Sequence, residues 1–247
     1  MNIPKRFIKP FPSYNEVFYD NLEQHKKHFL PICSINLQCI EPELDEWLHI
    51  VSAKEIYDGC VGDITQSFHT NFTKEDMLGF DIIDGKYKFE ADWNFFEIEQ
   101  ETYDIIEKAY VCNEKDYQIR KEFFKRNQKI YPYSSFSKEF KSVEELEKDF
   151  VQKQTSGWGL NYPEVNGILD DINFMTEVGQ ELLEDCTSKD EIFDYTNLLY
   201  VPKNEDGHTF TYIGFVTGYY FQAYGADRIY LFFNKELRKA VICFEYT

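Results

Sequence analysis

The feature that most constrains the fold is a series of short, alternating apolar segments after Phe193. Residues 228–233 and 240–246 have the pattern of strands, and the polar residues 234–239 between them predict a tight turn. Residues 208–218 also alternate well between apolar and polar side chains. Short strands with tight connections predict an antiparallel β-meander in the C-terminal part of the chain.

Further strands and turns are predicted around this series. Residues 195–201 are strand-like, and residues 204–207 (Asn-Glu-Asp-Gly) supply hairpin turn chemistry. Residues 219–224 continue the apolar pattern toward a turn at 225–227. Earlier in the chain, residues 86–91 and 93–99 predict another hairpin.

Helical spacing of apolar residues occurs mainly before residue 192. It predicts helices over 43–57, 115–127 and 171–186. Ser142 followed by Glu145 has the pattern of a capping box, which predicts a helix start there. The class is therefore α+β, with a C-terminal β-meander packed against several amphipathic helices. We expect one domain over 1–247, helix-richer in 1–192 and β-rich in 193–247.

Composition indicates a folded and strongly acidic protein. The formal net charge is −18, and the chain also contains 23 Phe and 18 Tyr. Disordered acidic segments are poor in aromatic residues, so these rings predict a substantial core beneath an acidic surface. The charge is concentrated in residues 144–206, which hold 16 Asp and Glu against 4 Lys, a net of −12.

The sign of the charge also bears on partners and compartment. Phosphate backbones are bound by Lys and Arg, so a surface this acidic argues against nucleic-acid binding and favours a basic protein partner. Six dispersed cysteines are typical of reduced, core-packed thiols. The sequence has neither a signal-peptide pattern nor an apolar run long enough for a membrane span. We therefore expect a soluble, cytoplasmic protein.

One set of residues has the chemistry of a metal site. His25, His28, Cys33 and Cys39 carry imidazole and thiol groups, which are the ligands that Zn²⁺ prefers. Their spacing lacks the close pair of cysteines of a zinc finger, and the two histidines flank a pair of lysines whose charges would oppose a bound cation. The alternative is that the histidines are surface residues of a short helix and the cysteines pack along a strand. The sequence therefore predicts neither a bound metal nor a cofactor.

Two segments resemble YwqG-like bacterial proteins, a family of largely uncharacterised cytosolic proteins. One is Pro-Ile-Cys-Ser-Ile-Asn-Leu at 31–37, and the other extends from 212–218 through 228–233 to Phe-Glu-Tyr-Thr at 244–247. Residues 157–163 also resemble a Gly-Gly-x-Pro motif of the family, but the Gln that usually follows it is missing. The resemblance implies an α+β fold with antiparallel sheets, and it implies no active site.

Catalytic signatures such as a nucleophile elbow, a P-loop or a dinucleotide-binding fingerprint do not occur, which favours a non-enzymatic protein. The leading hypothesis is an acidic binding protein, such as a bacterial immunity protein or antitoxin that captures a basic nuclease toxin. Aromatic anchors inside an acidic rim are typical of protein interfaces. The candidate partner-binding residues are Trp158, Tyr162, Glu177, Glu181, Glu184 and Asp185.

Two other functions remain open. One is a small-molecule-binding protein or an enzyme with an unrecognised site, and the other is a structural or regulatory domain whose acidity only keeps it soluble. A protein interface should be broad and shallow with acids at its rim. A ligand site should be a cavity in which a titratable group is desolvated.

Overall fold

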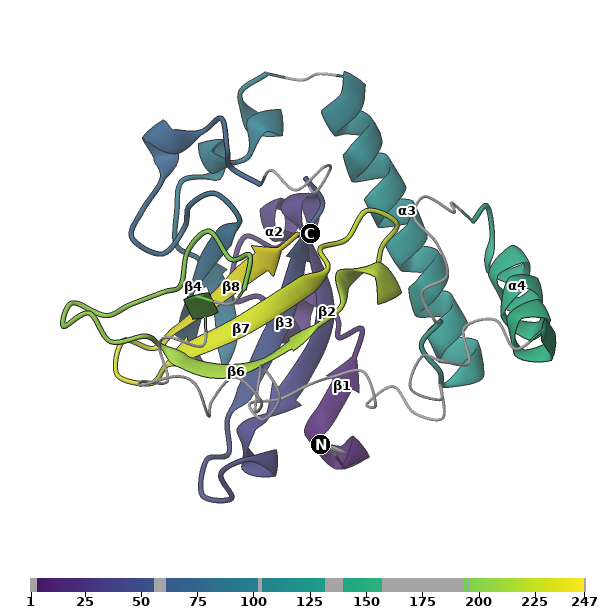
Figure 1. Ribbon diagram of the computed structural model, residues 1–247, viewed down its shortest axis with the longest axis horizontal. Coiled ribbons are helices and arrows are strands. Elements are labelled where there is room, and N and C mark those ends of the chain that lie inside the picture. The colour runs from purple at the N-terminus through teal and green to yellow at the C-terminus, as the bar shows by residue number, and fades with distance from the viewer. Residues whose placement is uncertain are drawn as a thin grey trace.

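Two antiparallel β-sheets form the centre of the computed structural model, which describes residues 4–55, 61–101, 104–131, 140–156, 193–194 and 196–246 (Figure 1). The smaller sheet has the order β1-β2-β3, with strands Ile8–Pro10, Phe29–Asn36 and Trp47–Ala53. The larger sheet has the order β5-β4-β8-β7-β6, with strands Lys86–Phe89, Met77–Ile83, Lys239–Glu245, Arg228–Asn234 and Thr211–Val216. All neighbouring strands pair antiparallel.

The main hydrophobic core lies between the two sheets, where β3 packs against β7 and β8. Alternation along the strands assigns side chains to the two faces of the larger sheet. Leu231 on β7 points into the main core, whereas its neighbours Tyr230 and Phe232 join a second cluster with Phe193 and Phe210. Both faces of the sheet are therefore covered, which explains why β7 and β8 are almost continuously apolar.

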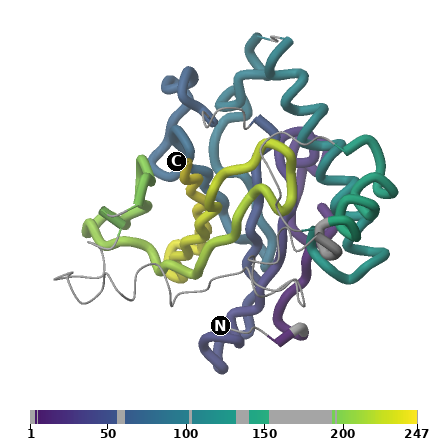
Figure 2. Tube along the Cα trace, turned by 45° about the vertical axis from the view of Figure 1, so that its right-hand side comes forward, coloured from purple at the N-terminus to yellow at the C-terminus, as the bar shows by residue number. Residues whose placement is uncertain are grey.

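Helices surround the sheets, and α3 and α4 lie together on one side of them (Figures 1 and 2). The α-helices are α1 (Tyr14–Val17), α2 (Leu22–His28), α3 (Asp104–Asn127) and α4 (Val143–Ser156). Single turns of 3₁₀-helix occur at η1 (Lys5–Phe7), η2 (Leu37–Cys39), η3 (Gln66–Phe68), η4 (Trp93–Phe95), η5 (Glu97–Glu99) and η7 (Gly218–Tyr220). In the described part of the chain, no helix has the length and apolar character needed to span a membrane.

The predicted start of α4 is confirmed. The backbone amide of Glu145 donates to Ser142 Oγ at 3.4 Å, and the Glu145 carboxylate accepts from the Lys141 amide at 2.8 Å. The carboxylate thus bonds one residue earlier than a standard capping box predicts. Leu146 and Phe150 face inward and pack against Phe123 of α3, which attaches α4 to the rest of the molecule.

The α+β class and the C-terminal meander are confirmed, since β6, β7 and β8 follow one another in both sequence and sheet. The predicted turn at 204–207 is also present, with the Gly207 amide donating to the Asn204 carbonyl at 3.0 Å. Gly207 has φ of +83°, a conformation that glycine adopts without a steric penalty. Residues 219–224 do not continue the strand, because the chain turns into η7 after β6.

The predicted helix at 43–57 is wrong. The structure has strand β3 over Trp47–Ala53, paired along its length with β2. Apolar residues at helical spacing misled the prediction because β3 is buried on both faces, so its sequence shows no strict alternation. The predicted helix at 115–127 is confirmed and begins earlier, at Asp104.

Two other strand predictions are wrong. Residues 93–99 form η4 and η5 instead of pairing with β5, whose hairpin partner is β4. Residues 196–201 form bends instead of a strand, and Tyr195 lies outside the described residues. In the first segment Phe95 and Phe96 are buried, whereas in the second Leu199 and Tyr200 are exposed. Strand propensity alone does not separate such irregular segments from strands.

Candidate functional site

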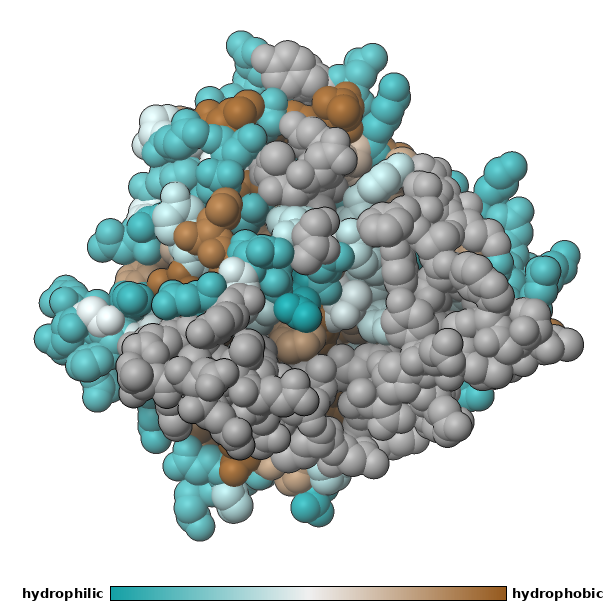
Figure 3. Space-filling model, in the orientation of Figure 1, coloured by the Kyte–Doolittle hydropathy of each residue, from teal (hydrophilic) through white to brown (hydrophobic). Residues whose placement is uncertain are grey.

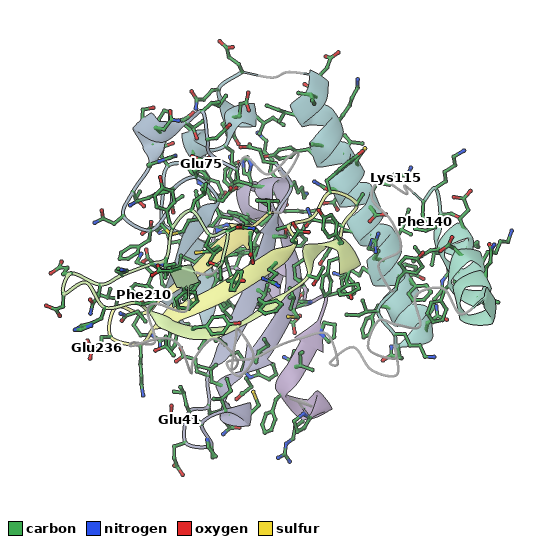
Figure 4. The ribbon with its side chains drawn as sticks, viewed as in Figure 1. Glu41, Glu75, Lys115, Phe140, Phe210 and Glu236 are labelled. Atoms are coloured by element: carbon green, nitrogen blue, oxygen red, sulfur yellow. The ribbon has the colours of Figure 1, made fainter. Side chains whose placement is uncertain are left out.

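A groove of about 630 Å³ lies at one end of the sheets and is the strongest candidate site. The 37–46 connection, which carries Glu41, and the β7–β8 turn, which carries Glu236, lie at this end of the molecule (Figure 4). The β4–β5 turn, β1 and α1 complete the walls. The lining residues are Lys9, Asn15, Glu16, Ser34, Leu44, Asp45, Glu46, Trp47, His49, Asp84, Gly85, Lys86 and Arg238.

Ser34 and His49 form a buried hydrogen-bonded pair that lines this groove. They are direct partners in the β2–β3 register, so their side chains lie on the same face of the sheet. Ser34 Oγ and His49 Nδ1 are 2.7 Å apart, and the two residues are 2% and 3% exposed. The other ring nitrogen, Nε2, lies 3.1 Å from the Gly85 carbonyl oxygen.

These contacts fix the proton positions on the pair. A carbonyl oxygen only accepts, so His49 Nε2 carries the hydrogen that it donates to Gly85. In the neutral imidazole Nδ1 is then an acceptor, and it takes the hydroxyl hydrogen of Ser34. The hydroxyl of Ser34 is therefore committed as a donor to His49.

The β4–β5 turn places the Gly85 carbonyl over His49. Asp84 and Gly85 have φ of +50° and +73°, and they connect Ile83 and Lys86, which are paired in the strand register. Two central residues with positive φ define a type I′ hairpin, for which Asp-Gly is a preferred sequence. The local sequence therefore builds the turn that orients the imidazole.

Burial and charge keep His49 neutral. The pKa of His49 is lowered from 6.5 to about 4, chiefly by desolvation and also by the nearby charges of Lys9 and Lys86. The Gly85 carbonyl and the charge of Glu16 raise this pKa and oppose the shift. An imidazole with such a low pKa is a weak base, so the pair is better suited to hydrogen bonding than to activating a serine nucleophile.

The groove carries charges of both signs, and several are already paired. Arg238 forms an ion pair with Glu46 at 2.6 Å. Lys9 lies 3.7 Å from a Glu16 oxygen, and its ammonium stands 4.7 Å from the centroid of the Trp47 ring. The side chain of Asp45 accepts a hydrogen bond from Asn36 at 2.7 Å. Among the described residues, Lys86 and Asp84 have no ion-pair partner.

A second cluster of titratable groups is buried beneath α2 and α3. His28 Nε2 lies 2.7 Å from Glu99 Oε1, and His28 Nδ1 lies 2.8 Å from the Tyr110 hydroxyl. That hydroxyl lies 3.2 Å from Glu55 Oε2. The imidazole stacks on Phe96 with a centroid distance of 4.1 Å. Glu55, Tyr110, His28 and Glu99 thus form a continuous hydrogen-bonded chain, which we call the buried chain.

The buried chain must hold one extra proton. Its three hydrogen bonds need three hydrogens, whereas the Tyr110 hydroxyl and a neutral imidazole supply only two. Burial, with the charge of Glu97, raises the pKa of Glu55 to about 7. Burial lowers the pKa of His28 to about 3, against the opposing effect of Glu99. The third hydrogen therefore resides on Glu55 in acidic and near-neutral solution.

The structure uses His25 and His28, two of the candidate metal ligands, in internal contacts. Both are completely buried on α2, so the expectation of surface histidines is wrong. His25 Nδ1 lies 3.1 Å from the Asn21 carbonyl, and its Nε2 accepts from the Phe89 amide at 3.2 Å. Apolar contacts of the short helix with the aromatic core, which the sequence pattern does not reveal, bury these imidazoles.

The two cysteines are separated by their local structure. Cys33 is buried on β2, where desolvation raises the pKa of its thiol, whereas Cys39 ends η2 and is not on a strand as expected. Within the described ranges, no group of three or more His, Cys, Asp or Glu side chains is arranged to hold a metal ion.

The six predicted partner-binding residues all lie outside the described residues. They are Trp158, Tyr162, Glu177, Glu181, Glu184 and Asp185. One part of the acidic segment is described: Arg126 on α3 forms ion pairs with Glu144 at 3.0 Å and with Glu147 at 3.7 Å. Some charge of α4 is thus balanced within the protein.

Comparison with protein-family models, curated proteins and solved structures finds no match to this chain. The resemblance to YwqG-like proteins therefore stays a prediction. The described residues form a two-sheet α+β fold with a groove, lined mostly by charged and polar residues, at one end of the sheets.

Sequence reasoning missed Ser34 and His49 as a site. Ser34 was part of the segment 31–37 that carries the family resemblance, and His49 fell within the wrongly predicted helix. A signal was present in the Asp84-Gly85 pair, which predicts a hairpin turn. The contact of this turn with His49 depends on sheet packing and has no local sequence pattern.

Proposed function

We propose that this protein binds a small polar ligand in the groove. The observation that carries the proposal is the Ser34–His49 pair, a desolvated titratable group and its partner at the wall of a cavity of about 630 Å³. This volume is within the range of about 300–1,000 Å³ that is typical of small-molecule sites. A cavity with a desolvated histidine fits the criterion for a ligand site better than the criterion for a broad interface.

The groove also has the polarity of a site for a charged or hydrogen-bonding ligand. Leu44 and Trp47 are the apolar side chains of the lining, and most of the other lining residues are charged or polar. Among the described residues, Lys86 and Asp84 have no ion-pair partner. Figure 3 supports a polar exterior: among the described residues on the face shown, hydrophobic side chains form separate small areas between hydrophilic ones. A polar ligand suits these surroundings better than an apolar one.

A thermal-shift screen tests the proposal. The panel contains amino acids, dipeptides, dicarboxylates, sugar phosphates, nucleosides and polyamines. A ligand at about 100 times its Kd stabilises the folded protein by about 2.7 kcal/mol, which for this chain length raises Tm by roughly 5–10 °C. We expect at least one class to produce such a rise.

Two lysines of the same strand provide a matched pair of variants. Lys86 lines the groove, whereas Lys88 lies two residues further along β5 and pairs with Asp20 at 3.4 Å. Lys86→Ala should weaken ligand binding about tenfold or more, and Lys88→Ala should leave it unchanged. A panel without any stabilising compound, or equal effects of both variants, would contradict the proposal.

The acidic-surface hypothesis, in which an immunity protein or antitoxin captures a basic toxin, stays a separate prediction. Its supporting observation is the net charge of −12 in residues 144–206. Affinity capture from the native host at low and moderate salt tests it. One stoichiometric, basic and salt-sensitive partner would support this function instead of ligand binding.

A further inference from the structure

The hydrogen bonds of the Ser34–His49 pair determine what the groove can recognise. The hydroxyl hydrogen of Ser34 is committed to His49 Nδ1, and the Nε2 hydrogen is committed to Gly85. A hydroxyl oxygen that has donated its hydrogen still has an accepting lone pair. Toward the groove, Ser34 is therefore an acceptor and requires a ligand with an N–H or O–H donor.

The carboxylates of the groove favour a positively charged donor. Glu16, Asp45, Glu46 and Asp84 all line the cavity, and Asp84 has no ion-pair partner among the described residues. A ligand ammonium beside Ser34 would gain a charge-assisted hydrogen bond, and Glu16, whose charge acts on the neighbouring His49, would attract it. A simple anion would find no donor at Ser34.

Lys86, at the start of β5 directly after the β4–β5 turn, supplies the opposite charge in the groove. Lys9 forms an ion pair with Glu16 and Arg238 forms one with Glu46, whereas Lys86 has no ion-pair partner among the described residues. Lys86 follows Gly85 directly, and its charge acts on His49, so it is close to the buried pair. A ligand carboxylate is the natural partner for this lysine.

From these three features we infer that the groove binds a zwitterionic ligand of the amino-acid or short-peptide type, with its ammonium at Ser34 and its carboxylate at Lys86. This inference rests on the proposed function and names the ligand class of the same groove. A diamine is disfavoured because its second ammonium would meet the positive charge of Lys86. A dicarboxylate is disfavoured because it lacks a donor for Ser34.

Binding measurements with matched ligands test this inference on the unmodified protein. The probes are the twenty amino acids and a dipeptide library, each compared by isothermal titration with its N-acetylated and C-amidated forms. Hydrogen bonds to charged groups are worth about tenfold to a hundredfold in affinity. We expect N-acetylation of the best zwitterion to lower its binding affinity at least tenfold, and C-amidation to lower it by a similar factor.

Two variants assign the ligand groups to their partners. Ser34→Ala should reduce the loss caused by N-acetylation, and Lys86→Ala should reduce the loss caused by C-amidation, with Lys88→Ala as the control. Ligand modification on the wild-type protein keeps the test valid even where Ser34→Ala fails to fold. If Lys86→Ala still binds the free ligand more tightly than the C-amidated form by the same factor as the wild type, the ligand carboxylate does not lie at Lys86.

The possible results separate the two proposals. Equal binding of a zwitterion and its N-acetylated form overturns the inference about the ammonium. Binding of sugar phosphates or dicarboxylates without any zwitterion overturns the ligand class but leaves the groove as a ligand site. The absence of binding from every class in both panels overturns the proposed function together with the inference.

Discussion

The buried chain predicts that Glu55→Gln stabilises the protein at alkaline pH and not at acidic pH. Glu55 is 1% exposed, and its folded pKa is about 7 against an ordinary value of 4.5. The folded protein therefore binds more protons than the unfolded chain between these two values, so Glu55 lowers the free energy of unfolding as pH rises through this window. Above pH 7 the ionised carboxylate takes the Tyr110 hydrogen, and His28 Nδ1 loses its donor.

The size of the effect follows from the pKa difference. A gap of about 2.5 pH units, at about 1.36 kcal/mol per unit, corresponds to roughly 3 kcal/mol. Glutamine resembles the protonated carboxyl, because its amide can donate to the Tyr110 oxygen while its carbonyl oxygen accepts. The variant should therefore match the wild type near pH 4.5 and exceed its free energy of unfolding by about 3 kcal/mol near pH 8.

His28 masks this behaviour in the wild type. Its folded pKa of about 3 is below its ordinary value of 6.5, so its contribution to the free energy of unfolding rises with pH across that range. The two contributions oppose each other between about pH 4.5 and 6.5. Folding thus transfers a proton from the imidazole to Glu55, and only the difference between variant and wild type exposes the contribution of Glu55.

Urea unfolding followed by circular dichroism at half-unit steps from pH 4.5 to 8.5 measures this difference. Glu43→Gln is a matched control, because Glu43 is an exposed glutamate and its removal reports the loss of a surface charge alone. A gap between Glu55→Gln and wild type that stays constant within about 1 kcal/mol across this range would refute the proton assignment.

Three further predictions concern packing and buried polar contacts, and urea unfolding at pH 7 measures each. Tyr110→Phe removes the central hydroxyl of the buried chain and should cost about 1–3 kcal/mol; a loss below about 0.5 would argue against the chain. Arg120→Met should lower the free energy of unfolding by about 3–5 kcal/mol, because the buried carboxylate of Asp116 loses its ion-pair partner. The double variant Arg120→Met with Asp116→Leu should recover most of this stability. An equal loss in the single and double variants would contradict this explanation. Leu231→Ala, at a completely buried position, should cost about 2–5 kcal/mol, whereas Leu237→Ala on the exposed β7–β8 turn should have little effect.

Local chemistry explains which parts of the fold were predictable. The β7–β8 pair and the start of α4 were predicted because their turn and capping residues act within a few positions of one another. Strand β3 was mistaken for a helix because its burial on both faces comes from sheet packing. Tertiary context overrides local periodicity at such positions.

The candidate site was less predictable than the fold. The Ser34–His49 pair joins residues 15 positions apart, and its orientation depends on Gly85 a further 36 positions along the chain. The histidines of α2 are predicted to be surface residues of a short helix, whereas the structure buries both of them. Pairing across strands and burial by distant aromatic rings leave no recognisable local spacing.

The central place of β8 in the larger sheet has a consequence for folding kinetics. Strand β8 joins the β4–β5 hairpin to β7, although more than a hundred residues separate the hairpin from β6 along the chain. The hairpin therefore remains a two-stranded unit until residues 239–245 reach it, and isolated hairpins are marginally stable in water. Closure of this long loop must precede most of the stabilising contacts of the sheet, which is the behaviour of slow-folding, high-contact-order proteins. Lys239 on β8 forms ion pairs with Asp81 on β4 and with Glu90, each at 2.6 Å. These ion pairs can form only after β8 has reached the hairpin, and they then hold the two together.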